Sequence, residues 1–212
     1  MIATAGTNPD DADIGIVMLH GRGSDSSDMK SVYTQLYIKN VYAIMPRAPF
    51  EIMPGRYAWY AHFWNVNLEE NLKQIKESFI LLDDCINQLN EKGFSDDQIV
   101  LIGHSQGANV LMEYCVNFPR KFKAIVSMRG CFLGNVGANR EFKERLAGVS
   151  VVLNSGRQDP YIPQKKVDQT SAILEYLGAN VIKKQYETGH GICRAEIMDL
   201  RKLFKNNFSA KV

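Results

Sequence analysis

The sequence predicts an α/β fold with a mostly parallel central sheet that is covered by helices on both faces. Short runs that are apolar throughout alternate along the chain with longer segments whose apolar residues recur every three or four positions. Strands without a polar face are typical of a parallel sheet that is buried between two layers of helices. The chain has 212 residues, 45% of them hydrophobic and 23% charged, which fits one domain over residues 1–212.

Each element can be placed in order along the chain. Residues 1–5 and the turn-rich segment 8–11 predict a first strand at an antiparallel edge of the sheet. The apolar runs predict buried strands over residues 14–19, 41–45, 99–102, 124–128, 149–153 and 181–186. The segments of helical periodicity predict helices over residues 29–39, 72–89, 105–117, 164–177 and 194–208. Ligands of such sheets bind beyond the carboxyl ends of the strands, and the chemically informative residues of this chain follow those ends.

The pentapeptide Gly103-His104-Ser105-Gln106-Gly107 follows one of these strands and precedes a helix. A G-x-S-x-G sequence at a strand-to-helix turn is typical of a nucleophile elbow, in which a strained turn exposes a serine hydroxyl. Glycines two residues before and after the serine avoid a clash between strand and helix, and the helix N-terminus favours developing negative charge. The pattern alone also fits a purely structural turn, so the assignment of Ser105 depends on the partners that the rest of the chain supplies.

A serine hydroxyl needs a base to remove its proton, and the base is usually a histidine that a carboxylate orients. Asp159 follows the predicted strand 149–153, and His190 lies between two glycines after the predicted strand 181–186. Because the carboxyl ends of parallel strands meet at one edge of the sheet, all three side chains can come together. The chain order of serine, aspartate and histidine is also the order found in proteins with a nucleophile elbow.

Ordinary turns are the alternative for both partner loops, because Asp-Pro and Gly-His-Gly sequences also occur in turns without function. The agreement of chain order and position favours the catalytic interpretation. Three other acids compete with Asp159. Two of them lie within predicted helices and the third is only three residues before His190, so all three rank lower: Asp168, Asp199 and Glu187.

A tetrahedral intermediate on the serine needs hydrogen-bond donors for its oxyanion. The backbone N–H of Gln106, directly after the serine, is expected to be one donor. The second is expected from the loop after the predicted strand 14–19, which contains two glycines, and the N–H of Arg22 is the candidate. A structural turn with a satisfied imidazole is an alternative for His20, and neither His20 nor His104 is assigned a role in proton transfer.

Charge and composition argue against several classes of function. The net charge of +2 favours neither nucleic acid nor an anionic membrane as a partner. The sequence has no apolar stretch of about 18 residues, so stable insertion into a membrane is not expected. Residues 1–6 lack the pattern of a signal peptide. The four histidines are not clustered, so no metal site is expected. The cysteines form no C-x-x-C pair and are expected to be reduced thiols in a cytoplasmic protein: Cys85, Cys115, Cys131 and Cys193.

As a set, five motifs resemble the phospholipase/carboxylesterase family of α/β-hydrolases, which includes acyl-protein thioesterases and small bacterial carboxylesterases. The motifs are L-H-G-R-G-S (19–24), P-R-A-P (46–49), G-H-S-Q-G-A (103–108), S-G-R-Q-D-P-Y-I-P (155–163) and G-H-G (189–191). The resemblance covers nearly the whole chain and is strongest to the bacterial esterases. It implies an α/β-hydrolase fold without a lid and a reaction that needs no cofactor. Many members form homodimers, so by analogy a homodimer is an open alternative for this chain. The site residues it implies are the triad Ser105, Asp159 and His190 and the oxyanion donors Arg22 and Gln106.

Two features depart from the family pattern. Arg129 stands where the family usually has a small residue before a glycine. Two interpretations are open for it: it narrows the acyl site or attracts an anionic group, or it faces solvent like most arginines. The chain also lacks the long glycine-rich segment that acyl-protein thioesterases carry before their central tryptophan, which argues against a role on protein thioesters.

Six of the aromatic residues crowd between positions 50 and 64, with no clear period. We expect a loop there whose side chains wall an apolar pocket for an acyl or aryl group beside Ser105. The alternative is a loop that packs its aromatic rings into a satellite core. The residues expected to line the substrate pocket are Trp59, Tyr60, Phe63 and Arg129.

The leading hypothesis is a serine hydrolase that cleaves small-molecule carboxylic esters of small to medium acyl or aryl groups through an acyl-enzyme on Ser105. Hydrolysis of a thioester or a lysophospholipid by the same residues is open, because pocket shape rather than the triad sets the substrate. Two other classes are less favoured. A non-catalytic ligand-binding protein does not need an intact triad, and a metal-dependent hydrolase needs a ligand cluster that the sequence lacks.

Overall fold

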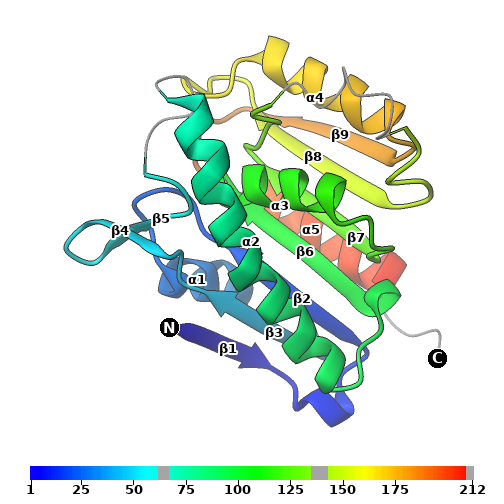
Figure 1. The fold of residues 1–212 in the computed structure, drawn as a ribbon. Coiled ribbons are helices and arrows are strands. Elements are labelled where there is room, and N and C mark those ends of the chain that lie inside the picture. Colours follow the sequence, from blue (N-terminus) through cyan, green and yellow to red (C-terminus); the bar gives the residue numbers. More distant parts are fainter. Residues whose placement is uncertain (62–66, 135–142, 209–212) are drawn as a thin grey trace.

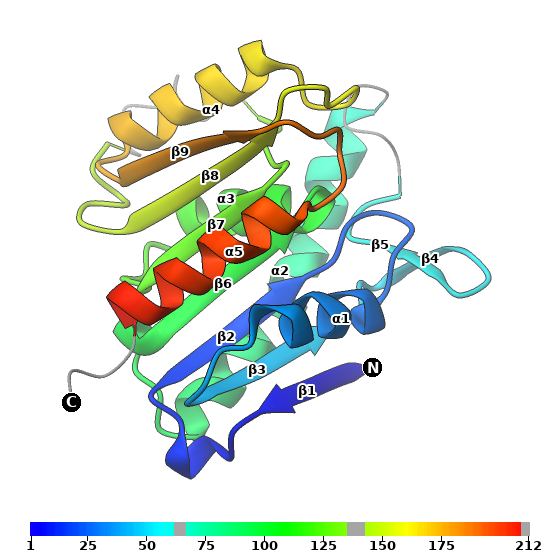
Figure 2. The same ribbon diagram turned by 180° about the vertical axis from the view of Figure 1, so that it is seen from behind.

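The computed structural model describes residues 1–61, 67–134 and 143–208. Its centre is a seven-stranded sheet in the order β1-β3-β2-β6-β7-β8-β9 (Figures 1 and 2). β1 pairs antiparallel with β3, and every other pair in this sheet is parallel, which confirms the mostly parallel sheet with an antiparallel edge strand. The strands are β1 (Ile2–Gly6), β2 (Ile14–Leu19), β3 (Val41–Pro46), β6 (Ile99–His104), β7 (Ala124–Met128), β8 (Ser150–Gly156) and β9 (Asn180–Tyr186).

The register of the parallel strands brings their carboxyl ends to one edge of the sheet. Leu19 at the end of β2 pairs with Gly103, and His104 at the end of β6 pairs with Met128 at the end of β7. β8 and β9 also end together. The loops that follow these five strands therefore meet above the same edge, although they come from distant parts of the sequence.

Helices cover both faces of the sheet, as the sequence predicts. One layer, in front in Figure 1, consists of α2 (Leu68–Glu91), α3 (Gln106–Asn117) and α4 (Gln164–Tyr176). The other layer, in front in Figure 2, consists of α1 (Ser26–Leu36) and α5 (Arg194–Leu203). Short 3-10 helices lie at Pro9–Asp11 and Asp96–Gln98, and a π-helical turn at Phe204–Phe208 follows α5. In the parts of the chain that the structure describes, no helix combines the length and the apolar character that a membrane span needs.

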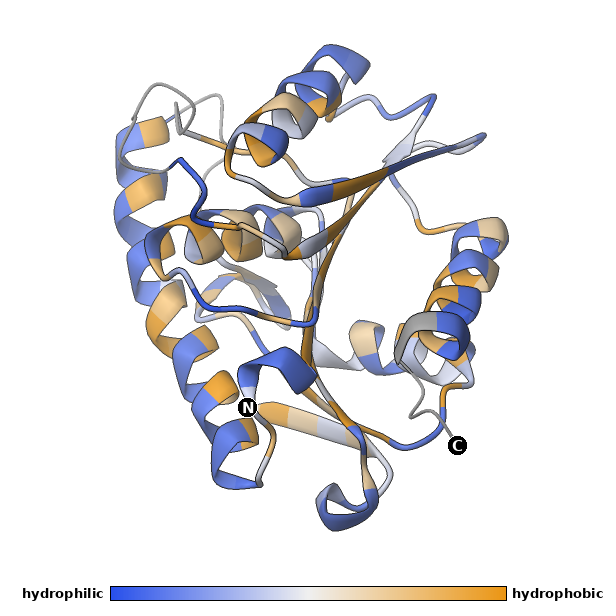
Figure 3. Ribbon diagram, turned by 90° about the vertical axis from the view of Figure 1, so that its right-hand side faces the viewer, coloured by the Kyte–Doolittle hydropathy of each residue, from blue (hydrophilic) through white to orange (hydrophobic). Residues whose placement is uncertain are grey.

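The sheet divides the hydrophobic core into two halves. Neighbouring residues of a strand point to opposite faces, so Leu101 of β6 joins the half under α2, α3 and α4, and Ile102 joins the half under α1 and α5. The first half includes Leu82 and Leu111, and the second includes Leu200; all are at most 1% exposed. Figure 3 shows the sheet edge-on, with hydrophobic strands between helices whose outer faces are hydrophilic.

Several element boundaries differ from the sequence prediction, and those of α1 and α5 have a visible cause or consequence. α1 begins at Ser26, three residues earlier than expected, because the side chain of Asp25 accepts a hydrogen bond from the N–H of Ser27 and caps the helix. α1 ends at Leu36, where Tyr37 takes a left-handed conformation with φ 47°. At the other end of the chain, α5 stops at residue 203 and residues 204–208 continue as the π-helical turn.

The aromatic segment after β3 begins as a hairpin and not as the loop expected from the sequence. β4 (Phe50–Met53) pairs antiparallel with β5 (Arg56–Ala58), and the hairpin projects from the body of the molecule (Figure 1). Gly55, with φ 70°, supplies the left-handed conformation that the turn requires. The Pro54-Gly55 pair is a turn signal between two short strand-like runs, so the sequence did contain the information.

Candidate active site

Ser105 lies on a strained turn between β6 and α3. Its φ of 52° falls in the left-handed region, which is unfavourable for a residue with a side chain. Strand and helix approach each other so closely that a Cβ on Gly103 would lie 2.5 Å from the backbone nitrogen of Ala108. A Cβ on Gly107 would lie 2.4 Å from the carbonyl oxygen of Leu19. The two glycines of the motif are therefore required by the packing of the turn that holds the serine.

Ser105, His190 and Asp159 come from three separate loops and form one hydrogen-bonded chain. Nε2 of His190 lies 2.8 Å from Oγ of Ser105, and Nδ1 of the same ring lies 2.8 Å from Oδ2 of Asp159. A carboxylate only accepts hydrogen bonds, so Nδ1 carries the ring proton and Nε2 is left to accept a proton from the serine hydroxyl. The arrangement has the geometry of a nucleophile, a base and an orienting acid.

Asp159 is fixed by its own loop. Its Oδ1 accepts the N–H groups of Tyr161 at 2.8 Å and Ile162 at 3.0 Å, and its side chain is only 1% exposed. The ring of Tyr161 lies edge-on to His190, with the ring centroids 4.9 Å apart. Each of the three rival acids pairs with a basic side chain instead: Asp168 with Lys183, Asp199 with Lys184, and Glu187 with Arg157.

The loop of residues 20–23, which follows β2, is held by neutral hydrogen bonds. Nδ1 of His20 lies 2.8 Å from the carbonyl oxygen of Gly21, and Nε2 accepts the N–H of Ala48 at 3.0 Å. These partners require a neutral imidazole with its proton on Nδ1, and burial lowers the pKa of His20 below its ordinary value. The indole N–H of Trp59 donates to the carbonyl of His20 at 2.7 Å. His20 is therefore a buried imidazole whose hydrogen bonds are satisfied, as in the alternative stated for it above.

Trp59 and Tyr60 lie behind the elbow and do not form a pocket wall. They are 0% and 1% exposed. The side chain of Gln106 bridges them. Its Oε1 accepts the backbone N–H of Trp59 at 3.2 Å, and its Nε2 donates to the backbone carbonyl of Tyr60 at 3.0 Å. Asn109 donates to the Tyr60 hydroxyl at 2.9 Å. The structure thus corrects the expectation for these two aromatic residues, which brace the elbow from within the core, and Phe63 lies outside the described residues.

The two residues expected to supply oxyanion donors lie close to Ser105. Gln106 is the first residue of α3, and the first N–H groups of a helix have no partner within the helix. Arg22 lines the same cleft as Ser105 and His190. A negatively charged oxygen at Ser105 would therefore lie at the positive end of the α3 dipole, and the donor from Arg22 stays a prediction.

Arg129 is buried beneath the loop that follows β9. Its guanidinium forms an ion pair with Glu196, with Nη1 2.7 Å from both carboxylate oxygens and both side chains 0% exposed. Nη2 donates to the carbonyl of Gly191 at 2.9 Å, and Nε donates to that of Gly189 at 3.4 Å. These carbonyls stand on either side of His190. The structure corrects both expectations for Arg129, which neither faces solvent nor lines a substrate pocket. Its hydrogen bonds instead fix the loop that carries His190.

His104 provides a further anchor for the same loop. Its Nε2 lies 3.0 Å from the carbonyl oxygen of His190. A carbonyl oxygen only accepts, so Nε2 of His104 carries a proton. Burial lowers the pKa of His104 to about 4, which leaves the ring neutral at pH 7. His104 thus holds the backbone of His190 without adding a charge beside it.

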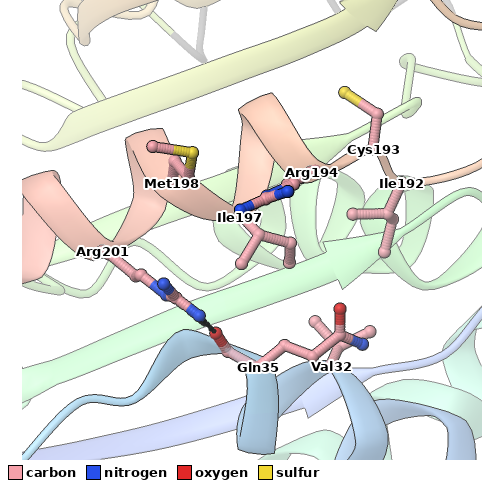
Figure 4. A pocket seen from close by; sticks show the side chains of 8 residues that line it. All are labelled: Val32, Gln35, Ile192, Cys193, Arg194, Ile197, Met198 and Arg201. Carbon is pink, nitrogen blue, oxygen red and sulfur yellow. Dashed lines mark hydrogen bonds between the residues drawn. The ribbon is translucent and has the colours of Figure 1, made fainter.

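A cleft of about 270 Å³ opens beside Ser105, next to a larger groove. Its lining includes residues 21–22, side chains of α1, and His104, His190 and Ile192. The groove, of about 480 Å³, runs between α1 and α5 and shares Val32 and Ile192 with the cleft. Figure 4 shows the residues that line the groove: Val32, Gln35, Ile192, Cys193, Arg194, Ile197, Met198 and Arg201.

Sequence reasoning missed Glu196 and the groove. Glu196 lies on the buried face of α5. The sequence did contain a signal for this ion pair: an acid on the apolar side of an amphipathic helix, and an arginine directly after a buried strand. The groove depends on how far apart α1 and α5 settle on the sheet. That spacing is set by packing between distant segments and has no local signature.

The chain is similar in sequence and fold to several known proteins. The model of the phospholipase/carboxylesterase family matches residues 7–207. Acyl-protein thioesterase 1 of Kluyveromyces lactis is 24% identical over 200 residues, which covers 87% of this chain and 88% of the relative. A phospholipase/carboxylesterase of Dyadobacter fermentans has a TM-score of 0.82 at 25% identity and covers 97% of this chain and 96% of its own. A carboxylesterase of Bacillus cereus has a TM-score of 0.80 at 19% identity and covers 98% and 94%.

Proposed function

Since the chain belongs to the phospholipase/carboxylesterase family and has its α/β-hydrolase fold, we propose that it is a serine hydrolase of small-molecule carboxylic esters with small to medium acyl or aryl groups. The observation that supports this most strongly is the hydrogen-bonded chain from Ser105 through His190 to Asp159. A fold alone does not carry an activity, whereas here each catalytic role has a residue in reach of the next.

In the proposed reaction, Nε2 of His190 takes the proton of Ser105 as the serine Oγ attacks the carbonyl carbon of the ester. The N–H groups of Gln106 and Arg22 stabilise the negative charge that builds on the carbonyl oxygen. The bond to the alcohol then breaks, and His190 gives its proton to the leaving oxygen. Water, deprotonated by the same imidazole, attacks the acyl-enzyme and frees Ser105. Asp159 stabilises the imidazolium in both halves of the reaction.

A thioester is the second candidate substrate, because the relative from Kluyveromyces lactis is an acyl-protein thioesterase. The same steps apply with a thiol as the leaving group. The two candidates are separated by kcat/KM for an oxygen ester and a thioester that carry the same acyl group. The thioester is intrinsically more reactive, and its rate of hydrolysis by hydroxide relative to that of the ester measures this difference. A preference of the protein for the thioester that exceeds this difference would replace the ester proposal with the thioester proposal.

Hydrolysis of p-nitrophenyl esters from acetate to palmitate tests the proposed activity. We expect turnover by the native protein, an optimum in acyl length, and a loss of about 10⁴-fold or more in kcat in Ser105→Ala. Turnover that persists in Ser105→Ala would contradict the acyl-enzyme on this serine. A protein that cleaves no ester or thioester in the series would contradict the proposal as a whole.

We also propose a cytoplasmic location, which the state of the cysteines supports. All four are unpaired, and three of them are buried. Cytoplasmic proteins keep their thiols reduced. A titration of the protein unfolded without reductant, directly after its isolation from the source cells, should count four free thiols, and a lower count would argue for an oxidising compartment.

A further inference from the structure

The groove between α1 and α5 has no part in the chemistry described above. Its volume of about 480 Å³ falls within the range of roughly 300–1,000 Å³ that small-molecule sites occupy. The groove adjoins the cleft of Ser105, since Val32 and Ile192 line both. A substrate whose ester group lies at Ser105 can therefore extend into the groove.

We propose that the groove binds the leaving group of the substrate, and that this leaving group carries a negatively charged phosphate or carboxylate that Arg194 binds. The inference rests on the proposed function and names its substrate class, an ester of an anionic alcohol. It also gives a role to an arginine that lines a groove next to the active site.

The position of His190 determines which half of the substrate enters the groove. The imidazole hands its proton to the leaving oxygen, so the alcohol must lie on the His190 side of Ser105. Ile192, two residues after His190, forms the passage from cleft to groove together with Val32 of α1. Arg22, the expected oxyanion donor, lies on the loop after β2. The groove therefore begins where the alcohol, and not the acyl chain, leaves the serine.

The charges along this path favour an anion at Arg194, close to the passage from the cleft. Among the described residues that line the groove, the charged ones are Arg194 and Arg201, and none is acidic. Asp28 lines the cleft of Ser105 and adds a negative charge at that end of the path. α5 begins at Arg194, so the partial positive charge of the helix N-terminus acts in the same direction. An anionic group is repelled from the Asp28 end and attracted to Arg194.

The two arginines have different roles in this arrangement. Nε and Nη2 of Arg201 both donate to the carbonyl of Gln35, and the guanidinium lies 4.7 Å from the centre of the Tyr37 ring. Figure 4 shows Arg201 reaching across the groove to α1. Arg201 thus joins α1 to α5 and closes the groove at one end. Arg194 is exposed at the end nearer His190, where it can bind a ligand.

The apolar lining sets the kind of spacer between the ester and the anion. Val32 and Ile192 line the passage between the cleft of Ser105 and Arg194, and they offer no charged partner (Figure 4). A short hydrocarbon spacer would bury apolar surface there at roughly 25 cal/mol per Å². The preferred alcohol therefore has a few carbon atoms between its oxygen and its charge.

Four esters with one acyl length test the proposal. One has a neutral alcohol, one has an alcohol that ends in a carboxylate, and one has an alcohol that ends in a phosphate monoester. The fourth has a neutral alcohol and carries a carboxylate at the end of its acyl group. The readout is the ratio of kcat/KM for each charged ester to kcat/KM for the neutral ester. The ratio is measured in the native protein, in Arg194→Gln and in Lys202→Gln, which removes the same charge from α5 at a side chain that is 70% exposed and outside the groove.

We expect a ratio above one for at least one ester with its charge on the alcohol, and a fall of that ratio by about fivefold in Arg194→Gln. Lys202→Gln should leave the ratio unchanged, and added salt should lower it in the native protein. The larger of the two alcohol-side ratios identifies the anion as phosphate or carboxylate.

Other results would overturn the proposal. A ratio that Arg194→Gln does not change, or that Lys202→Gln lowers equally, would show that Arg194 does not bind the anion. A preference for the acyl-side carboxylate would place the wrong half of the substrate in the groove. If the native protein cleaves the neutral ester without favouring any charged one, only this inference fails, whereas no cleavage of any ester would contradict the proposed function itself.

Discussion

Two loops flank Ser105, and they are held in place by different means. The loop of residues 20–23 is held by neutral groups: the imidazole of His20, which bonds two backbone groups, and the indole of Trp59, which bonds the His20 carbonyl. The loop after β9, which carries His190, is held by the buried ion pair of Arg129 and Glu196. Both sets of anchors are at most 1% exposed, so the two loops differ in the charge of their supports and not in their burial.

The difference follows from what each loop must do. The loop of residues 20–23 has to keep a backbone N–H in position, and neutral hydrogen bonds suffice for that. The other loop has to hold an imidazole that becomes positively charged during the reaction. An arginine can bond two carbonyls around His190 at once, and Glu196 cancels its charge, so the loop is fixed without a net charge that would oppose protonation of His190. Asn154 donates to Glu196 at 3.0 Å and completes the pairing.

The largest effect should follow from breaking the charged support. Arg129→Met leaves Glu196 buried without its partner, which should lower the free energy of unfolding by about 3–5 kcal/mol. Denaturant unfolding measures this. Glu196→Gln, added to Arg129→Met, should restore much of the stability but not kcat, because the two carbonyls beside His190 still lack their donor. Full recovery of kcat in the double variant would mean that Arg129 stabilises the fold without positioning His190.

A smaller effect on the same loop depends on pH. The pKa of His104 is about 4 in the folded protein, against an ordinary value of 6.5. Between these values the unfolded chain binds more protons than the folded one, so the free energy of unfolding falls as the pH drops from 7 to 5. His104 should account for about 2 kcal/mol of that loss.

The measurement is denaturant unfolding of the native protein and of His104→Gln at both pH values. The variant should lose less stability on acidification. The lowered pKa of His20 acts in the same direction and should leave a residual dependence in the variant. An identical dependence in the two proteins would show that His104 does not carry this coupling.

The smallest effect should come from the neutral support. Trp59→Phe removes the N–H that bonds the His20 carbonyl but keeps most of the ring volume, so stability should fall by about 1 kcal/mol. We expect kcat to fall several-fold less than in Arg129→Met. Thermal or denaturant unfolding and ester hydrolysis on the two variants side by side would check this. A Trp59→Phe variant as impaired as Arg129→Met would remove the distinction between the two loops.

The sequence revealed the parts of the site that depend on local signals. Ser105, Asp159 and His190 each follow a strand whose carboxyl end lies at one edge of the sheet, so strand prediction and chain order sufficed to bring them together. The turn glycines at 103 and 107 carried the same local information. The antiparallel first strand and the helices on both faces were also readable from periodicity and turn residues.

Other parts depend on contacts between distant segments. Arg129 and Glu196 are 67 residues apart, and their pairing has no pattern that one segment could show. Trp59 and Tyr60 were expected at a pocket because aromatic residues in a loop fit both a pocket and a core. Only their hydrogen bonds to Gln106 and Asn109 place them behind the elbow. The groove likewise arises from the spacing of two helices.

Labelling by a fluorophosphonate probe tests most directly whether Ser105, His190 and Asp159 act together. The probe reacts with a serine only when a base activates its hydroxyl. We predict a single label that peptide mass spectrometry maps to Ser105, no label in Ser105→Ala, and a labelling rate lower by about 10²-fold or more in His190→Gln. An unlabelled native protein, a label on another residue, or an unchanged rate in His190→Gln would contradict the catalytic assignment.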